Sequence, residues 1–255
     1  MRSYQNYVFD LYGTLIDIHT NEQKPYLWKK MSHIYTVYGA DYSWQKMKET
    51  YFHLVYEEEQ KLSEETGIPF PEIRLESVFR KMFLKKAPSG LPEGIDEKTW
   101  LHLMLNTFRC LSREKFAVYP GTFLKLEELK KQGCRVFLLS NAQGIFTRPE
   151  IQVSGLSQYF EAIYLSSDYG MRKPQPEFLR KLMREYRLNP EETVMLGNDI
   201  ASDIKIADEC GIDSILLNTW HDTEEAIRKR FDDTEIKALD RVYVLLSGQI
   251  YDLCI

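Results

Sequence analysis

The sequence predicts an α/β protein with a parallel sheet covered by helices on both faces and a helical bundle inserted near its start. Three observations support this fold class. A short apolar run over residues 7–9 ends abruptly at Asp10 and a glycine turn. From Pro120 onward, strand and helix patterns alternate, as they do in parallel α/β sheets. Between residues 18 and 116 the strand signal almost vanishes and helical periodicity dominates.

The elements of the expected sheet follow in order after the insertion. Further strands are predicted where β-prone apolar runs occur, over residues 135–139, 162–165, 193–196, 214–217 and 241–246. Amphipathic helices are predicted between them, over residues 122–132, 177–186 and 200–210. Glycines 133 and 211 end the first and last of these helices, and prolines precede the second. Units of this kind form a parallel sheet with right-handed crossovers.

The insertion is interpreted as a bundle of helices, predicted over residues 23–38, 43–66, 72–86 and 96–112. Proline- and glycine-rich breaks punctuate it. We therefore predict two domains, a core of residues 1–17 and 117–255 and a helical cap of residues 18–116. An insertion that leaves the sheet directly after a strand tip is placed to act as a lid over that tip.

Composition limits the class of protein. The 255 residues are 44% hydrophobic and 28% charged, which is typical of a soluble globular chain. A net charge of −5 without a basic block argues against nucleic acid or an anionic membrane as the main partner. The four cysteines lack metal-type spacing and are expected to be small buried hydrophobes. Without a leader or a long apolar run, a cytoplasmic location is expected; oligomeric state leaves no signal.

Polar residues gather at or after the ends of the expected strands. Because parallel strands end at one edge of a sheet, and ligands bind there, we expect these side chains to form one site. The residues are Asp10, Ser140 with Asn141, Lys173, and Asp199 with Asp203.

This set of residues suits phosphate chemistry. Asp10, Asp199 and the backbone carbonyl of Tyr12 offer the oxygen ligands that Mg²⁺ prefers. Lys173 offers a fixed positive charge, and Ser140 a hydrogen-bond donor to phosphate oxygens. A nucleophilic Asp10 would divide one difficult displacement into two easier ones through an aspartyl intermediate.

The order of four motifs resembles the haloacid dehalogenase (HAD) superfamily of hydrolases. The motifs are FDLYGTL at 9–15, LLSN at 138–141, RKPQP at 172–176, and GND at 197–199 with Asp203 and Ile204. The resemblance covers the first strand and nearly all of residues 118–218. It implies a Rossmann-like sheet with a cap inserted after the first motif, and a Mg²⁺-dependent phosphatase of a small phosphorylated metabolite.

The resemblance also assigns roles. Asp10 would be the nucleophile, Ser140 the phosphate binder and Lys173 the charge stabiliser. Substrate contacts would come from Ser140, Asn141, Lys173 and Thr14, and metal contacts from Asp10, Tyr12, Asp199 and Asp203. Asn198 stands where many relatives carry Asp, so either Asp199 or Asp203 is the direct ligand, and Asp203 is equally a candidate for orienting Lys173.

Tyr12 departs from the phosphatase pattern, which has a second Asp at this position as acid and base. A phenol with a pKa near ~10 is a poor replacement at neutral pH. Tyr12 is still a candidate catalytic residue. The leaving group departs without help, another residue such as His19 supplies the proton, or turnover is slow.

Tyr12 and the Ser140-Asn141 pair also look like the metal-free 2-haloacid dehalogenase branch. That branch holds the substrate carboxylate with an early cap arginine, whereas this chain has no arginine between Arg2 and Arg74. Dehalogenase is therefore the second hypothesis, and a non-catalytic phosphometabolite-binding or interaction module is the third.

Two further residues near the motifs carry open interpretations. Asp168 orients Lys173 or caps a helix, and Arg148 reaches an anionic substrate or is solvated on a helix.

Overall fold

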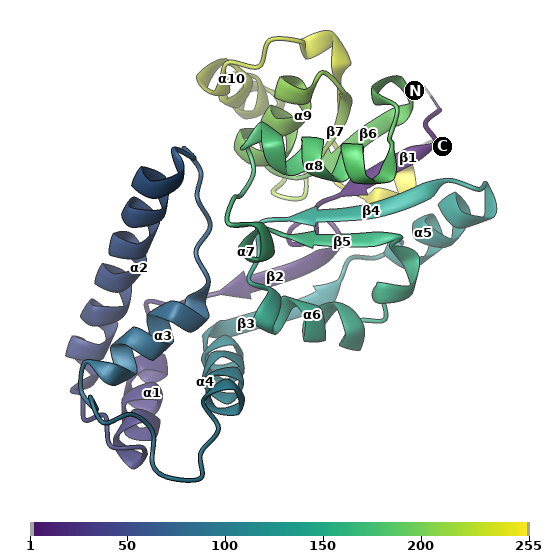
Figure 1. The fold of residues 1–255 in the computed structure, drawn as a ribbon. Coiled ribbons are helices and arrows are strands. Elements are labelled where there is room, and N and C mark those ends of the chain that lie inside the picture. Colours follow the sequence, from purple (N-terminus) through teal and green to yellow (C-terminus); the bar gives the residue numbers. More distant parts are fainter. Residues whose placement is uncertain (1–2, 254–255) are drawn as a thin grey trace.

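The computed structural model describes residues 3–253 and is built on a six-stranded sheet (Figure 1). All neighbouring strands are parallel, in the order β5-β4-β1-β6-β7-β8. Their bounds are β1 Asn6–Phe9, β4 Arg135–Ser140, β5 Ala162–Leu165, β6 Thr193–Gly197, β7 Asp213–Leu217 and β8 Val242–Leu245. The predicted α/β fold class is confirmed. The chain order reverses beside β1, and ligands of open α/β sheets bind at such a reversal.

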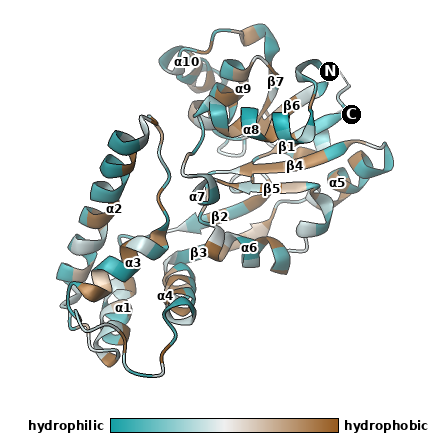
Figure 2. Ribbon diagram, in the orientation of Figure 1, coloured by the Kyte–Doolittle hydropathy of each residue, from teal (hydrophilic) through white to brown (hydrophobic). Residues whose placement is uncertain are grey.

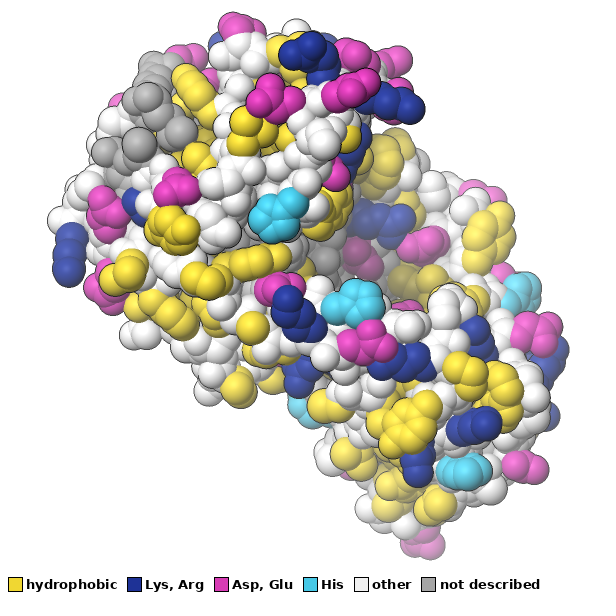
Figure 3. All heavy atoms as spheres, turned by 180° about the vertical axis from the view of Figure 1, so that it is seen from behind, with side chains coloured by type: hydrophobic (Ala, Val, Ile, Leu, Met, Phe, Trp, Pro, Cys, Tyr) yellow, Lys and Arg dark blue, Asp and Glu magenta, His cyan; other side chains and the backbone are white. Residues whose placement is uncertain are grey.

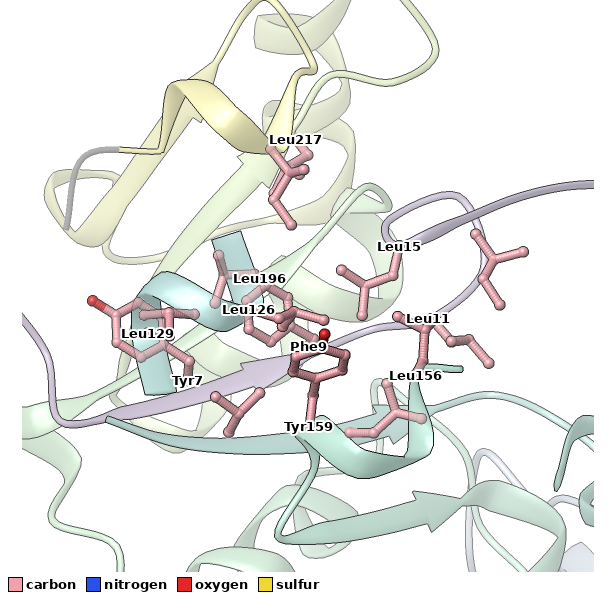
Figure 4. Close-up of a cluster of buried hydrophobic side chains, with 14 of the residues drawn as sticks. Tyr7, Phe9, Leu11, Leu15, Leu126, Leu129, Leu156, Tyr159, Leu196 and Leu217 are labelled. Atoms are coloured by element: carbon pink, nitrogen blue, oxygen red, sulfur yellow. The ribbon is translucent and has the colours of Figure 1, made fainter. Parts of the chain in front are cut away.

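Alternation along β1 explains the two covered faces. Tyr7 and Phe9 belong to one hydrophobic cluster, shown in Figure 4, and Val8 between them belongs to another. The first cluster includes residues of α5 (Thr122–Lys131) and α6 (Gly144–Val153). The second includes residues of α8 (Pro176–Tyr186) and α9 (Lys205–Cys210). In Figure 2 the apolar colouring is clear along β4.

The inserted region forms a hydrophobic cluster of its own. Its helices are α1 Pro25–Val37, α2 Trp44–Thr66, α3 Leu75–Leu84 and α4 Glu97–Ser112. Trp28, Tyr35 and Phe108 are fully or almost fully buried within it. Helix α2 begins at Ser43, whose side chain accepts the N–H of Lys46, and α4 begins likewise at Asp96. Figure 3 shows this region as a smaller lobe, with a hollow between it and the larger one.

The insertion joins the sheet through two strands that were not predicted. Strands β2 (Ile16–Thr20) and β3 (Arg113–Val118) pair antiparallel and carry the chain out and back. The predicted domain limits at 17/18 and 116/117 fall within this ribbon, so the expectation of almost no strand in residues 18–116 is wrong at both ends. Both strands are short and partly exposed, and their pairing joins segments almost a hundred residues apart, so local sequence carries little signal.

Other local differences have simple causes. Residues 200–210 begin with a π-helical turn, Ile200–Ile204, before α9, because the N–H groups of Asp203 and Ile204 both bond to the carbonyl of Asp199. Helices α6, α7 (Ser166–Tyr169) and α10 (Glu224–Thr234) were not predicted. Cys110 is exposed, so it was wrongly expected to be buried; Cys134 and Cys210 are partly buried, and Cys254 lies outside the described residues. Across residues 3–253, no helix combines the length and apolar character needed to cross a bilayer.

Candidate active site

Asp10, Lys173 and Asp203 form the buried centre of the site. Asp10 lies directly after β1, and its backbone N–H donates to Leu196 O at 2.8 Å. The Nζ atom of Lys173 donates to Asp10 Oδ1 at 2.6 Å, to Asp203 Oδ1 at 2.6 Å and to Leu139 O at 2.8 Å. An ammonium group has three protons, so all of them are used. Lys173 is 3% exposed and Asp203 is 1% exposed, which fixes the geometry.

Two hydroxyl groups complete the surroundings of the Asp10 carboxylate. Ser140, the last residue of β4, donates to Asp10 Oδ1 at 3.0 Å. Thr14 Oγ1 lies 3.3 Å from Asp10 Oδ2 and 3.4 Å from Asn198 Oδ1. Oδ1 is thus held by two donors, whereas Oδ2 has one weak partner and is the freer oxygen.

The charges of this centre do not balance. One ammonium lies against two carboxylates, so a site with both acids ionised carries a net negative charge. Burial raises the pKa of Asp203 to about 7, against the lowering effect of Lys173, and the nearby Asp10 raises it further. For Lys173, burial lowers the pKa, but the two carboxylates outweigh it and leave the pKa raised. The lysine is therefore charged, and the excess negative charge favours a cation.

Two glycines make the close packing possible. A Cβ atom on Gly197, at the end of β6, would lie 2.1 Å from Asp203 Oδ2. Gly13 has a φ of +83°, and a Cβ there would lie 2.4 Å from Asn198 Nδ2. The glycines of the first and fourth motifs therefore let the loops after β1 and β6 approach each other.

A cavity of about 420 Å³ opens on these residues. It is lined by Asp10, Tyr12, Gly13, Ile18, Ser140, Asn141, Lys173, Asn198, Asp199, Ser202, Asp203 and Trp220. The predicted site residues are brought together around it, with Thr14 buried beside Asp10.

The outer wall of the cavity holds Asp199 in a different manner. Its Oδ1 accepts from Arg230 Nη2 at 2.9 Å, and Arg230 also donates to Asp222 Oδ2 at 3.0 Å. The guanidinium lies 4.6 Å from the ring centroid of Trp220. Thr219 Oγ1 donates to Gly13 O at 2.7 Å and ties this loop to the turn after β1.

Sequence reasoning missed this outer wall. Trp220 follows the end of β7 by three residues, so the strand-tip rule that identified Asp10 would have found it. Arg230 lies far from any motif on α10, and no local signal marks it.

The donors around the cavity fit Mg²⁺ by their chemistry. Asp10, Asp199 and the carbonyl of Tyr12 are hard oxygen ligands on one cavity, and two carboxylates with retained waters are a usual set for this ion. Within residues 3–253, no group of three or more His, Cys, Asp or Glu side chains is placed to hold a metal. Both oxygens of Asp203 already accept hydrogen bonds, from Lys173 and from the N–H of Asp199, which favours the orienting role for Asp203.

The Tyr12 side chain is directed to α6. Its hydroxyl donates to Glu150 and lies 3.1 Å from Thr147 Oγ1. Arg109 of α4 binds both oxygens of Glu150, at 2.8 and 3.0 Å, and its guanidinium lies 5.2 Å from the centroid of the Tyr12 ring. Burial and the Glu150 carboxylate raise the pKa of Tyr12 well above its ordinary value. These contacts make the phenol a poor proton donor to a substrate.

The remaining candidates have other partners. Asn141 donates to Lys173 O and accepts from Lys173 N–H, so its amide holds the lysine backbone. Asp168 pairs with Arg148 and not with Lys173, which contradicts the orienting interpretation of Asp168. His19 is exposed, lies 2.6 Å from Glu114, and is not among the residues that line the cavity.

Comparison with known proteins places these features in a family context. A sequence model of hydrolases described as haloacid dehalogenase-like matches residues 4–211. Phosphoglycolate phosphatase of Nitrosococcus oceani is 31% identical over 51% of this chain and 57% of its own length. Glyceraldehyde 3-phosphate phosphatase of Pyrococcus furiosus is 27% identical over 64% of each chain. Phosphoserine phosphatase of Thermus thermophilus is 28% identical over 56% of this chain and 54% of its own.

The matches therefore span between about half and two thirds of these curated relatives. Among solved structures, the 2-haloacid dehalogenase of Pseudomonas syringae has a TM-score of 0.59 at 18% identity. This similarity covers 88% of this chain and 91% of that one. At this identity the likeness supports the fold alone.

Proposed function

The chain belongs to the haloacid dehalogenase-like hydrolases, and we propose that within this family it is a Mg²⁺-dependent phosphatase of small phosphorylated metabolites. The observation that carries the proposal is the contact of Asp10 with Lys173 at the reversal point of the sheet. Relatives named as phosphatases support it.

In the proposed reaction, Asp10 Oδ2 attacks the phosphorus atom in line with the leaving oxygen. Oδ1 stays anchored by Lys173 and Ser140, so the freer oxygen is presented to the cavity. The P–O bond to the leaving group breaks as the aspartyl-phosphate bond forms. Water then attacks the phosphorus of this intermediate, releases inorganic phosphate and restores Asp10. Lys173 offsets negative charge in both steps, and Ser140 is placed to donate to a phosphate oxygen.

Asp10, Asp199 and the Tyr12 carbonyl would hold the metal ion. When bound, Mg²⁺ supplies positive charge that offsets the phosphate and the excess of carboxylates in the site. Asp203 serves in this proposal by holding Lys173.

The proton for the leaving group does not come from Tyr12, because its hydroxyl is engaged with Glu150. We therefore expect turnover to depend steeply on the leaving group. p-Nitrophenyl phosphate should react at least ~10²-fold faster than a simple alkyl phosphate, since general acid catalysis contributes about that much. Equal rates on the two esters would indicate that another group supplies the proton.

The test is phosphate release from p-nitrophenyl phosphate with Mg²⁺ and with EDTA. Release that requires Mg²⁺ and is lost in Asp10→Asn is the expected result. The Asp10→Asn protein should keep its thermal stability within a few degrees, which separates loss of the nucleophile from loss of fold. The absence of release from the folded wild-type protein would contradict the proposal.

Tyr12 and the Ser140-Asn141 pair keep a dehalogenase as the second candidate. The same assay with 2-chloropropionate distinguishes it: halide release that persists in EDTA would favour this alternative. Thermal stabilisation by a phosphorylated ligand without any turnover would favour a binding module.

A further inference from the structure

The loop between α2 and α3 pairs with the segment that leads into Lys173. In Figure 1 this loop passes beside α7. The backbone contacts are Arg172 N–H to Phe70 O at 3.0 Å, Glu72 N–H to Gly170 O at 3.1 Å, and an antiparallel bridge between Pro71 and Met171. The side chain of Arg172 adds an ion pair of 2.7 Å with Glu59 of α2. The inserted region therefore contacts the core far from the β2–β3 ribbon.

The partly buried carboxylate of Glu72 joins this loop to two strand tips. Oε1 accepts from Gln143 Nε2 at 2.7 Å, and Oε2 accepts from Ser166 Oγ at 2.8 Å. Gln143 follows β4, Ser166 follows β5, and both are buried. Gln143 also donates to Ile73 O at 2.9 Å and accepts the N–H of Leu75 at 3.1 Å, so its whole amide is used by the inserted region.

These contacts meet at Lys173 from two directions. On one side, Asn141 grips the backbone of Lys173 at 2.7 and 3.0 Å, and Asn141 precedes Gln143 by two residues. On the other, the bridged segment ends at Arg172, the residue before Lys173. A displacement of this backbone moves an ammonium whose three protons are all committed. Misplacement of a catalytic group by about 1 Å can cost on the order of 10²-fold in rate.

We propose that Glu72 is a positioning residue, through which the inserted helical region holds Lys173 and the loop after Ser140 in their working arrangement. The inference rests on the proposed function for the role of Lys173, whereas the coupling itself rests on the contacts above. It assigns the insertion a part in arranging the charged groups of the site, in addition to any covering role.

Hydrogen exchange tests the coupling without any assay of activity. In Glu72→Ala, the amides of Arg172 and Lys173 should exchange at least about fivefold faster, because their acceptors are held in place through Glu72. The matched control is Glu58→Ala. Glu58 accepts from Ser77 and Lys81, all within the inserted region, so its loss should leave the exchange of these two amides unchanged.

Steady-state kinetics test the positioning. With p-nitrophenyl phosphate, Glu72→Ala should lower kcat by about tenfold or more and change KM by less than about threefold, because the lost geometry concerns the transition state. Glu72→Gln keeps the shape and one acceptor, and should recover at least half of kcat. Glu58→Ala should retain the kcat of the wild type. Should Glu72→Ala fail to fold, Glu72→Gln is measured in its place in both experiments.

The outcomes separate the two ideas. Unchanged exchange at Arg172 and Lys173 in a folded Glu72 variant overturns the coupling. Faster exchange with an unchanged kcat overturns the positioning role. A wild-type protein without phosphatase activity contradicts the proposed function, and the exchange comparison then decides the coupling alone.

Discussion

The inner and outer parts of the site contain the same kind of contact in different surroundings. Lys173 meets Asp10 and Asp203 at 2.6 Å, with all three side chains at most 9% exposed. Arg230 meets Asp199 and Asp222 at 2.9 and 3.0 Å, with side chains that are 30% exposed. Solvent screens the outer pairs, whereas the inner charges depend on each other. The comparison teaches that the inner part is rigid by necessity and the outer part is free to exchange partners.

The strongest test of this contrast is Lys173→Met. Asp10 and Asp203 would then be buried without a counter-charge. We expect the free energy of unfolding of the metal-free protein to fall by about 3–5 kcal/mol. Urea denaturation at neutral pH measures it. A loss below about 1 kcal/mol would mean that the inner charges are not mutually dependent.

Gly197→Ala tests the packing behind the inner part. The new methyl group meets the Asp203 carboxylate, so we expect a loss of about 1–3 kcal/mol together with reduced activity. Gly144→Ala is the matched control, because its methyl would meet only the flexible end of Asp168. Equal effects from the two variants would contradict the packing argument.

The pH dependence of stability tests the charge excess of the inner part. Because the pKa of Asp203 is raised from 3.8 to about 7, the folded protein keeps a proton that the unfolded chain releases between these values. Its contribution to stability is full below the lower value and is lost as pH rises through the upper one. Between about pH 4.5 and about pH 7.5, Asp203→Asn should lose about 1–2 kcal/mol less than the wild type. Urea denaturation in EDTA measures both proteins, and parallel pH profiles would exclude this titration.

The smallest effect is expected for Arg230→Met, the outer counterpart of Lys173→Met. Its pairs are partly exposed, so the loss of stability should stay below about 1 kcal/mol and shrink further at high salt. Denaturation at low and high ionic strength measures it. A loss as large as that of Lys173→Met would remove the distinction between the two parts.

The inner part was predictable because its information is local. Asp10, Ser140 and Asp203 lie in or just after β-prone runs, and the geometry of a parallel sheet brings such strand ends to one edge. Lys173 was found through its motif, because it lies seven residues beyond the end of β5 and the fold alone does not place it.

The outer wall and the contacts of the insertion depend on tertiary approach. Arg230 reaches Asp199 across 31 positions, and Glu72 reaches Ser166 across 94. Nothing in the neighbouring residues marks either partner. The same holds for the ribbon, where Ile16 faces Val118. The role of Tyr12 also depended on such an approach, because Glu150 decides where its hydroxyl points.

The antiparallel ribbon has a consequence for engineering. Since Thr20 and Arg113 face each other in adjacent strands, the chain leaves and returns at neighbouring points. Residues 21–112 thus behave as a cassette: a tight hairpin turn could bridge the cut ends, and a foreign helical unit with closely spaced termini could be spliced in there. Such chimaeras would let substrate range be exchanged while the sheet is kept.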